Sequence, residues 1–358
     1  MGLRGALALV GVLVVFAVAL NAYDRGRIRD RVRRLFEGRF AAPEAPDEAP
    51  SPPEPPPWSE RRVLHAAPEA ADEEPESDEE PFGAIDFLVF LPGETPVVRD
   101  AALGIYKQNE YVIDKPHRLY GRRVGARAWR NLAKDREDAR YELLALALQL
   151  ADRAGPVSEA DLNAITQIGL KLADALDRPP RFNMSFEEGL ERAQALDKFC
   201  SAFDVIASIH VVADSVPVFR GPAIERAAQE VHMEFGARNI FHRKSGESDG
   251  RPNLYSLANQ FHPGSFDPLR LDSLQTQGLT LFMSVPCTPD PVATFTDMVR
   301  DARVIARRLG GKLQDADRRV LTEAGLRAIT KQIASIAERM AHQGITPGTL
   351  NAMRLFPP

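Results

Sequence analysis

An uncharged apolar segment close to the N-terminus is the feature that most restricts how this chain can fold. Residues 5–22 contain no charged side chain and consist mainly of Ala, Val, Leu and Gly. As a helix, this segment would be about 27 Å long at ~1.5 Å per residue, close to the ~30 Å hydrocarbon core of a bilayer. The sequence therefore predicts a transmembrane anchor over residues 1–22.

The basic residues around the segment decide between an anchor and a cleavable signal peptide. Ala17-Val18-Ala19 resembles a signal-peptide cleavage site. However, only Arg4 precedes the apolar run, whereas seven arginines follow it between residues 25 and 39. The positive-inside rule keeps such a flank in the cytoplasm. We therefore expect a single-pass membrane protein with its N-terminus outside, its domains in the cytoplasm and a basic juxtamembrane segment over residues 23–40, which either sets topology or recognises lipid headgroups.

A proline-rich acidic segment follows over residues 41–82. It contains 11 prolines and 13 acidic residues against two arginines. So little apolar surface cannot offset the entropy of ordering the chain, and proline together with like charges keeps such a chain extended. We expect a disordered linker that reaches at most ~130 Å, at ~3.1 Å per residue. It is either an arm that lets a distal domain search away from the membrane or an indifferent spacer.

Composition excludes several functional classes. The net charge of −5 leaves no basic surplus to neutralise nucleic-acid phosphates. The two cysteines, Cys200 and Cys287, are too few for a disulfide framework or a four-thiolate metal site. We expect free thiols in a reducing compartment, with a single disulfide as the alternative. The seven histidines form no H-E-x-x-H motif, so no metal or other cofactor is predicted.

No catalytic motif has the structural context that it needs. Residues 246–250 match the G-x-S-x-G pattern, but that nucleophile requires a helix directly after it, whereas Pro252 and a strand-like run follow here. Residues 310–312 lack the rest of a phosphate-binding loop and are interpreted as a helix end. His242 and His262 are interpreted as surface or hairpin residues. The pattern favours a binding protein over an enzyme.

From about residue 83 the chain has the pattern of two α+β repeats, each an antiparallel sheet with helices on one face. In the first repeat, residues 83–200, strands are predicted at 85–91, 117–122, 129–132 and 141–150, and helices at 97–107, 156–176 (N-cap Ser158) and 186–199. In the second repeat, residues 203–343, strands are predicted at 205–212, 239–243, 253–259 and 279–285, and helices at 223–235, 290–309 and 323–340. Residues 119–123 and 240–244 are the best local match between them. Residues 344–358 are assigned to a tail.

The helices of the second repeat leave one face of its sheet uncovered. In the strand at 279–285 the apolar residues alternate and face the helices, which leaves Thr280 and Phe282 on the opposite side. The same alternation at 205–212 leaves Ile206, Ser208 and His210 outside. A large aromatic ring among small polar neighbours makes a shallow apolar patch of the kind that marks interaction sites. The alternative is that the first repeat or a second subunit packs on this patch.

Four segments of the second repeat have the order and spacing of a known domain. They are residues 239–243 (NIFHR), 254–259 (LYSLAN), 263–268 (PGSFDP) and 279–286 (LTLFMSVP). They resemble the C-terminal domain of the ZipA family, membrane proteins of the bacterial divisome, over about residues 203–340. The anchor, the basic segment and the proline-rich linker also resemble that family's architecture, whereas the first repeat is not part of its best-known members.

The resemblance implies that one sheet face is a shallow groove for the C-terminal tail peptide of FtsZ. Phe282 would occupy the family's main aromatic position. Arg238 and Gln260 stand where methionines line the groove in the best-known members, and His262 replaces a lysine, so we expect a more polar groove. The implied partner-binding residues are Ile206, Ser208, His210, Arg238, Ile240, Ala258, Gln260, His262, Thr280 and Phe282.

The sequence thus predicts a non-enzymatic tether that holds FtsZ at the inner membrane of the division site and stabilises the Z-ring during septum assembly. The alternative is a membrane-anchored adaptor of the same fold that binds another division or envelope protein. The first repeat would be a structural partner or a second binding surface for another divisome protein.

Overall fold

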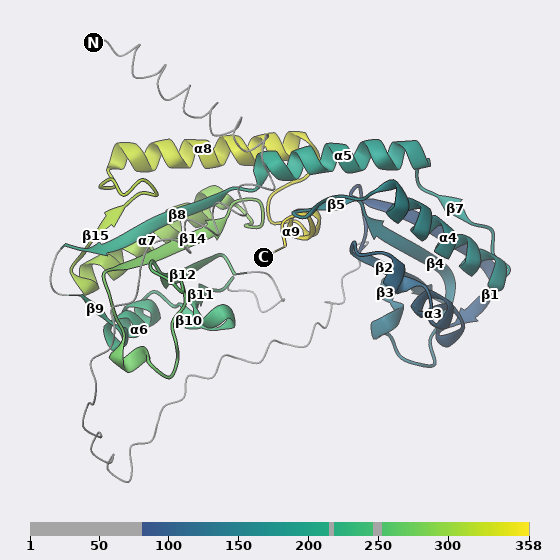
Figure 1. The fold of residues 1–358 in the computed structure, drawn as a ribbon, viewed down its shortest axis with the longest axis horizontal. Coiled ribbons are helices and arrows are strands. Elements are labelled where there is room, and N and C mark those ends of the chain that lie inside the picture. The colour runs from purple at the N-terminus through teal and green to yellow at the C-terminus, as the bar shows by residue number, and fades with distance from the viewer. Residues whose placement is uncertain (1–80, 215–217, 246–252, 358) are drawn as a thin grey trace, which may run out of the picture. The chain divides into compact units, whose positions relative to one another are not determined.

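The computed structural model describes residues 81–214, 218–245 and 253–357 (Figure 1). The predicted anchor, the basic segment and nearly all of the predicted linker lie outside the described residues, as does the loop that contains the G-x-S-x-G match. Within the described ranges, no helix is long and apolar enough to cross a membrane. The described residues form antiparallel sheets with packed helices, which confirms the α+β class.

The first domain is a five-stranded antiparallel sheet in the order β3-β2-β4-β1-β7. Its helices cover one sheet face, where alternate residues of β1 and β4 such as Val89 and Leu146 meet Leu162 of α4 in one core. The elements are β1 (Asp86–Val98), α3 (Arg99–Lys107), β2 (His117–Arg123), β3 (Trp129–Asn131), β4 (Arg140–Gln149), β5 (Ala151–Asp152), β6 (Gly155–Pro156), α4 (Glu159–Ala175), β7 (Arg181–Phe182) and α5 (Phe186–Phe203).

Two helices of this domain begin at serine caps. The Ser158 hydroxyl accepts a hydrogen bond from the Asp161 N–H at 3.2 Å, and the Asp161 carboxylate accepts one from the Ser158 N–H at 2.8 Å. Ser185 and Glu188 form the same reciprocal pair at the start of α5. Each pair satisfies two donors that have no partner within the helix. The predicted N-cap at Ser158 is confirmed.

The second domain is a six-stranded antiparallel sheet in the order β10-β11-β12-β14-β8-β15. Two short strands, β9 and β13, pair beside it. The elements are β8 (Ile206–Ala213), β9 (Phe219–Arg220), α6 (Gly221–Glu230), β10 (Glu234–Phe235), β11 (Phe241–Arg243), β12 (Tyr255–Asn259), β13 (Gln275–Thr276), β14 (Gly278–Ser284), α7 (Pro291–Leu309), β15 (Gly311–Gln314) and α8 (Glu323–His342).

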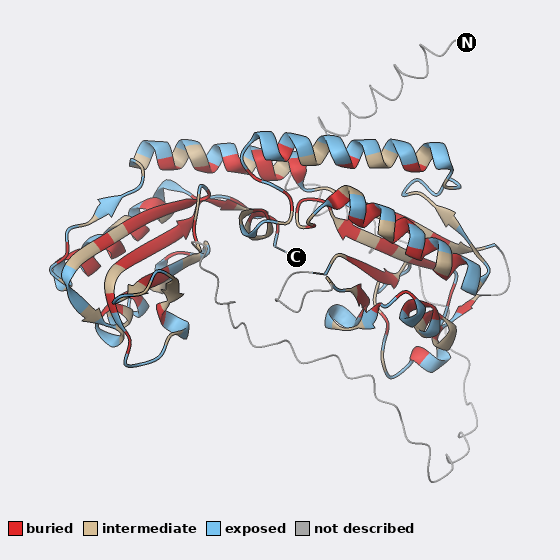
Figure 2. Ribbon diagram, turned by 180° about the vertical axis from the view of Figure 1, so that it is seen from behind, coloured by how far each residue is buried: buried red, intermediate tan, exposed pale blue. Residues whose placement is uncertain are grey.

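The helix-facing side of this sheet is buried as the alternation predicts (Figure 2). Ile209 of β8 and Leu281 of β14 lie in one core with Phe295 and Met298 of α7. Gly310 ends α7 in the left-handed conformation, with φ 68°, as glycine at a helix end commonly does. The predicted end of this helix is confirmed.

The helix predicted at 223–235 ends earlier than expected. His232 adopts a positive φ of 56°, so the chain reverses there and α6 ends at Glu230. Phe235 then joins β10, and its ring lies 5.2 Å from that of Phe241 on β11. The sequence pattern predicted too long a helix because Phe235 continues the apolar spacing of α6, although it belongs to β10.

The two segments that match best in sequence have different neighbours in their sheets. In the first sheet, β2 lies between β3 and β4, and in the second, β12 lies between β11 and β14. Residues 119–123 belong to β2, which pairs with β4, whereas residues 240–244 belong to β11 and its end, and β12 separates β11 from β14. The match of residues 119–123 with 240–244 stays a prediction.

Residues assigned to a tail complete the core of the first domain. After α8, the short helix α9 (Leu350–Leu355) places its buried side chains in that core. The contributing residues after the second sheet are Met340, Ile345, Ala352, Leu355 and Phe356. Arg354 pairs with Asp86 of β1, and its carbonyl accepts a hydrogen bond from the Gln149 side chain at 2.9 Å. The first core is thus built from chain segments on both sides of the second domain.

Both cysteines are free thiols, as predicted. Cys200 is buried on α5, and the Cys287 thiol donates to the Phe356 carbonyl at 3.1 Å. Burial raises the pKa of the Cys287 thiol, which keeps it protonated and unreactive at neutral pH.

Candidate functional site

The side of the second sheet away from its helices is the candidate site, and we call it the open face. It is formed by alternate residues of β8, β12 and β14. Phe282 lies opposite Ser208 on one neighbour and Ser256 on the other, and Thr280 lies opposite His210 and Ala258. Directly opposed residues have Cβ atoms only ~4.5–5.5 Å apart, so these two rows form one continuous surface across three strands.

Phe282 is the large apolar side chain at the centre of this surface. It is partly exposed, and the side chains beside it on β8 and β12 are serines. Ile206, opposite Ser284, extends the apolar surface at one end and is 59% exposed. The outward positions predicted for Ile206, Ser208, His210, Thr280 and Phe282 are partly or fully exposed. The five residues belong to adjacent strands and lie together.

His210 is held in place on the open face by its neighbour. Its Nδ1 lies 2.9 Å from the Thr280 hydroxyl. Burial lowers the pKa of His210, and the positive charge of Arg318 acts in the same direction, while Asp315 opposes them. A neutral imidazole at this position adds a polar group to the face without adding a charge.

His242 lies in the hairpin of β11 and β12, as one of its two interpretations had it, but it is buried and not a surface residue. It is 8% exposed on β11. Its Nε2 lies 2.9 Å from the Ala237 carbonyl, which can only accept, so Nε2 is the protonated nitrogen. Its Nδ1, 2.8 Å from the Ser256 hydroxyl, then accepts. Ser256 is the cross-strand neighbour of both His242 and Phe282, so this hydrogen bond fixes one wall of the open face.

The buried, neutral His242 predicts that the protein loses stability in mild acid. Burial lowers the pKa of His242 below its usual range, although the Ala237 hydrogen bond opposes this. The unfolded chain therefore binds a proton that the folded chain does not, and stability present above pH ~6.5 is lost as pH falls toward the folded pKa, by up to ~1.4 kcal/mol per unit. Urea unfolding of wild type and His242→Gln at pH 7.5 and 5.5 measures this loss.

The matched control for this prediction is His262→Gln, which removes an exposed imidazole. We expect wild type and His262→Gln to lose the same stability between the two pH values, and His242→Gln to lose less. An identical pH dependence in all three proteins would contradict the assignment to His242.

The other predicted site residues lie at the margin of the open face or beneath it. Ile240 and Ala258 are buried, because alternation identifies the side of a sheet but not what covers it, and their part in binding a partner stays a prediction. Arg238 is exposed in the turn before β11, with φ 59°. The Gln260 side chain lies against Gly278, and His262 belongs to the following loop.

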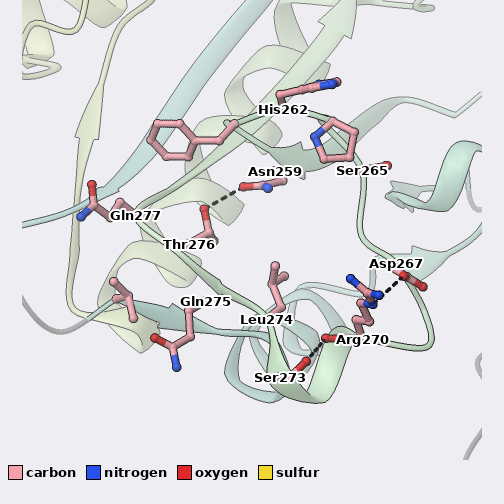
Figure 3. A pocket seen from close by; sticks show the side chains of 13 residues that line it. Asn259, His262, Ser265, Asp267, Arg270, Ser273, Leu274, Gln275, Thr276 and Gln277 are labelled. Atoms are coloured by element: carbon pink, nitrogen blue, oxygen red, sulfur yellow. Dashed lines mark hydrogen bonds and ion pairs between the residues drawn. The ribbon is translucent and has the colours of Figure 1, made fainter. Parts of the chain in front are cut away.

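His262 lines a separate hollow beside the sheet, with a volume of ≈ 780 Å³ (Figure 3). Ser265 and Asp267 also line it, so a histidine, a serine and an acid share one hollow. Among the described residues, however, no hydrogen bond joins these three side chains. Asp267 instead accepts from the Leu269 N–H at 2.9 Å and pairs with Arg270 at 3.8 Å. A catalytic serine needs its base within hydrogen-bond reach, so this arrangement does not form a nucleophile.

Two further side chains of the hollow donate hydrogen bonds within it. Thr276 donates to the Asn259 side chain at 2.7 Å, and Ser273 donates to the Arg270 carbonyl at 3.1 Å. In the described part of the chain, no three His, Cys, Asp or Glu side chains are grouped so as to hold a metal ion. The open face therefore remains the candidate site.

Sequence reasoning missed Ser256 and the role of His242. Alternation within residues 253–259 could have placed Ser256 beside Phe282, because both lie on the same side of adjacent strands. Nothing local to His242 indicates its burial, since the partner that fixes it, the Ala237 carbonyl, depends on the turn before β11.

Comparison with known proteins places the candidate site within a described family domain. Residues 205–332 match the family model of the ZipA C-terminal FtsZ-binding domain. A cell division protein ZipA from Shewanella denitrificans is 34% identical over 128 residues, which is 36% of this chain and 38% of that protein. The resemblance predicted from the sequence is thus confirmed for the second domain, while the match leaves out the first. The chain matches well under half the length of this curated relative.

Proposed function

We propose that this chain is a membrane tether for FtsZ in bacterial cell division. The second domain binds the C-terminal tail of FtsZ on the open face, and the N-terminal segment anchors the protein in the inner membrane. The observation that supports this most directly is that the family match, residues 205–332, contains the complete open face with Phe282 at its centre.

The surface chemistry of the open face suits a short, weakly bound peptide. One aromatic ring and Ile206 offer apolar contact, and His210, Thr280 and the serines offer hydrogen bonds. Ordering a flexible tail consumes much of the contact energy, so we expect an affinity near micromolar, about −8 kcal/mol. Many anchored copies facing one FtsZ filament would strengthen the attachment through multivalency.

We propose that the first and second domains are tandem copies of one fold. The shared strand order supports this: β2-β4-β1-β7 in the first sheet corresponds to β12-β14-β8-β15 in the second, with one helix after the first strand and another before the last in both. The first domain would then serve as a structural partner or as a second binding surface.

One observation favours the alternative of an adaptor for a different tail peptide. The open face is polar around Phe282, with two serines beside the ring, and the exposed residue at its margin is the cationic Arg238. A more acidic tail than that of FtsZ would suit this margin.

Titration of a fluorescent FtsZ tail peptide from the same organism into the full chain, reconstituted in lipid nanodiscs, tests the proposal. Phe282→Ala should weaken binding tenfold or more, about 1.4 kcal/mol, because it removes the only large ring in the two central rows. The full chain is needed because residues after the second sheet belong to the core of the first domain.

The matched control is Phe261→Ala, since Phe261 is also an exposed phenylalanine of the second domain but lines the separate hollow. It should bind the peptide as wild type does. No saturable binding to the wild-type chain would exclude FtsZ as the partner, and equal weakening by both substitutions would exclude the open face as the site.

A further inference from the structure

The first sheet has a face that corresponds to the open face, and it is covered. Its apolar residues are Leu88 and Phe90 of β1, Tyr120 of β2, and Ala145 and Ala147 of β4, all on the side away from the helices. Phe90, Ala145 and Tyr120 lie in one cross-strand row. Together with Trp129 of β3 these residues form a small cluster distinct from the main core.

The residue that covers this face is Phe82, which belongs to none of the strands of the sheet. It is only 5% exposed. Its ring centroid lies 5.0 Å from that of Trp129, 5.7 Å from Tyr120 and 5.9 Å from Phe90, with interplanar angles of 71°, 62° and 71°. We call these three rings the aromatic cradle. Edge-to-face contacts at such distances are favourable beyond simple burial.

The backbone on both sides of Phe82 is held by side chains. The Pro81 carbonyl accepts a hydrogen bond from Arg354 at 3.2 Å, and the Gly83 N–H donates to the Asp86 carboxylate at 2.8 Å. An aromatic anchor in a pocket, flanked by backbone hydrogen bonds, is how extended peptides are commonly recognised. Phe82 is also the last residue of the proline-rich acidic segment, so it joins the domain to its linker.

The charges of the cradle and of the linker sequence are complementary. Seven carboxylates lie within residues 72–80, directly before Pro81. On the domain, Arg122 lies over the Trp129 ring at 6.0 Å and pairs with Glu142 at 2.9 Å, and Arg118 is exposed on the same strand. Opposite charges at the margin of an interface raise association rates and favour the matching partner.

We propose that the face formed by the aromatic cradle is a peptide-binding site, occupied in cis by the end of this chain's own linker, with Phe82 as the anchor. The site's chemistry selects an acidic segment that ends in Pro-Phe. While Phe82 occupies the cradle, this face is closed to other peptides, which leaves the open face of the second domain as the accessible one. This goes beyond the FtsZ tether, because it assigns a ligand to the first domain.

The two tryptophans of the chain, Trp58 and Trp129, make the test direct. In a Trp58→Phe background of the full chain, Trp129 is the sole reporter of the cradle. Phe82→Ala should shift its emission to longer wavelength, because water replaces the Phe82 ring beside the indole. A synthetic peptide of residues 72–82, when added, should bind saturably and reverse this shift. Its affinity for Phe82→Ala should be at least tenfold higher than for the chain that retains Phe82.

Three controls separate a binding site from an ordinary core residue. The peptide with its phenylalanine replaced by alanine should not reverse the shift, and added salt should weaken binding of the intact peptide. Phe261→Ala should leave Trp129 emission unchanged. If folded Phe82→Ala protein does not bind the peptide, or if the chain that retains Phe82 binds it equally well, the proposal is wrong.

A second measurement covers the case in which Phe82→Ala is too unstable to assay by fluorescence. A ligand that binds only the folded state raises the melting temperature with its concentration. The 72–82 peptide should therefore raise the melting temperature of Phe82→Ala, and the alanine peptide should not. An unchanged melting temperature at saturating peptide would overturn the proposal.

Discussion

Replacing Arg354 with methionine should lower the free energy of unfolding by about 3–5 kcal/mol, because it leaves a buried carboxylate without its cation. The Asp86 side chain is 0% exposed, and both of its oxygens bind the Arg354 guanidinium, at 2.9 Å and 2.5 Å. Arg354 also bonds the Pro81 carbonyl. The remaining Gly83 N–H bond cannot compensate a buried charge. Equilibrium unfolding in urea at neutral pH measures the loss.

Two further variants separate charge from packing. Arg303→Met removes an arginine whose pair with Glu323 is exposed, and exposed pairs contribute ~0–1 kcal/mol, so it should have little effect. Asp86→Asn combined with Arg354→Met removes both charges and should regain part of the stability lost in Arg354→Met. A loss in Arg354→Met no larger than in Arg303→Met would show that the pair is not important for stability.

Arg178→Met should destabilise the first domain by a similar amount, about 3–5 kcal/mol, for a different reason. Arg178 is 4% exposed and donates to four backbone carbonyls, those of Leu91, Thr95, Tyr141 and Glu142. These carbonyls lie where the pairing of β1 with β4 is interrupted, between Pro92 and Val97. Methionine removes the Arg178 donors from all four, and a buried acceptor left unsatisfied costs about 1 kcal/mol or more.

The control for this variant is Arg181→Met, three residues along and exposed, which should change stability by less than ~0.5 kcal/mol. Arg178→Lys should fall between the two, because an ammonium has fewer donors and no planar fork. Burial lowers the pKa of the Arg178 guanidinium, yet its four acceptors favour the charged form. Urea unfolding followed by circular dichroism measures the free energy of unfolding of each variant. Equal stability of all three would contradict the role assigned to Arg178.

The parts of the fold that sequence reasoning predicted correctly are those with a local signal. Ser158 and Asp161 are three residues apart, and the alternation within β14 needs only seven residues. The four-residue edge strand β15 was missed, because Gly311–Gln314 is too short to show alternation and follows a helix end. Arg178 gave no signal either, since its acceptors are 36 to 87 residues away.

The candidate site was also predicted correctly only where the signal is local. Alternation put Thr280 and Phe282 on the outer side of β14, which the register confirms. It could not indicate that Ile240 and Ala258 are buried on that side, because burial depends on neighbouring turns. The aromatic cradle was missed for a similar reason: Phe82 closes a proline-rich run, where apolar periodicity has no meaning, and its three partners lie on three different strands.

Because residues 340–356 belong to the first core, the first domain cannot complete its core until the ribosome has nearly finished the chain. Asp86 emerges 268 residues before Arg354. At ~5–20 residues per second, the nascent first sheet waits roughly 10–50 s for its last core side chains. The second domain, whose core is complete by α8, can fold during this interval. The second domain can then complete its core before the first domain does, against the direction of synthesis.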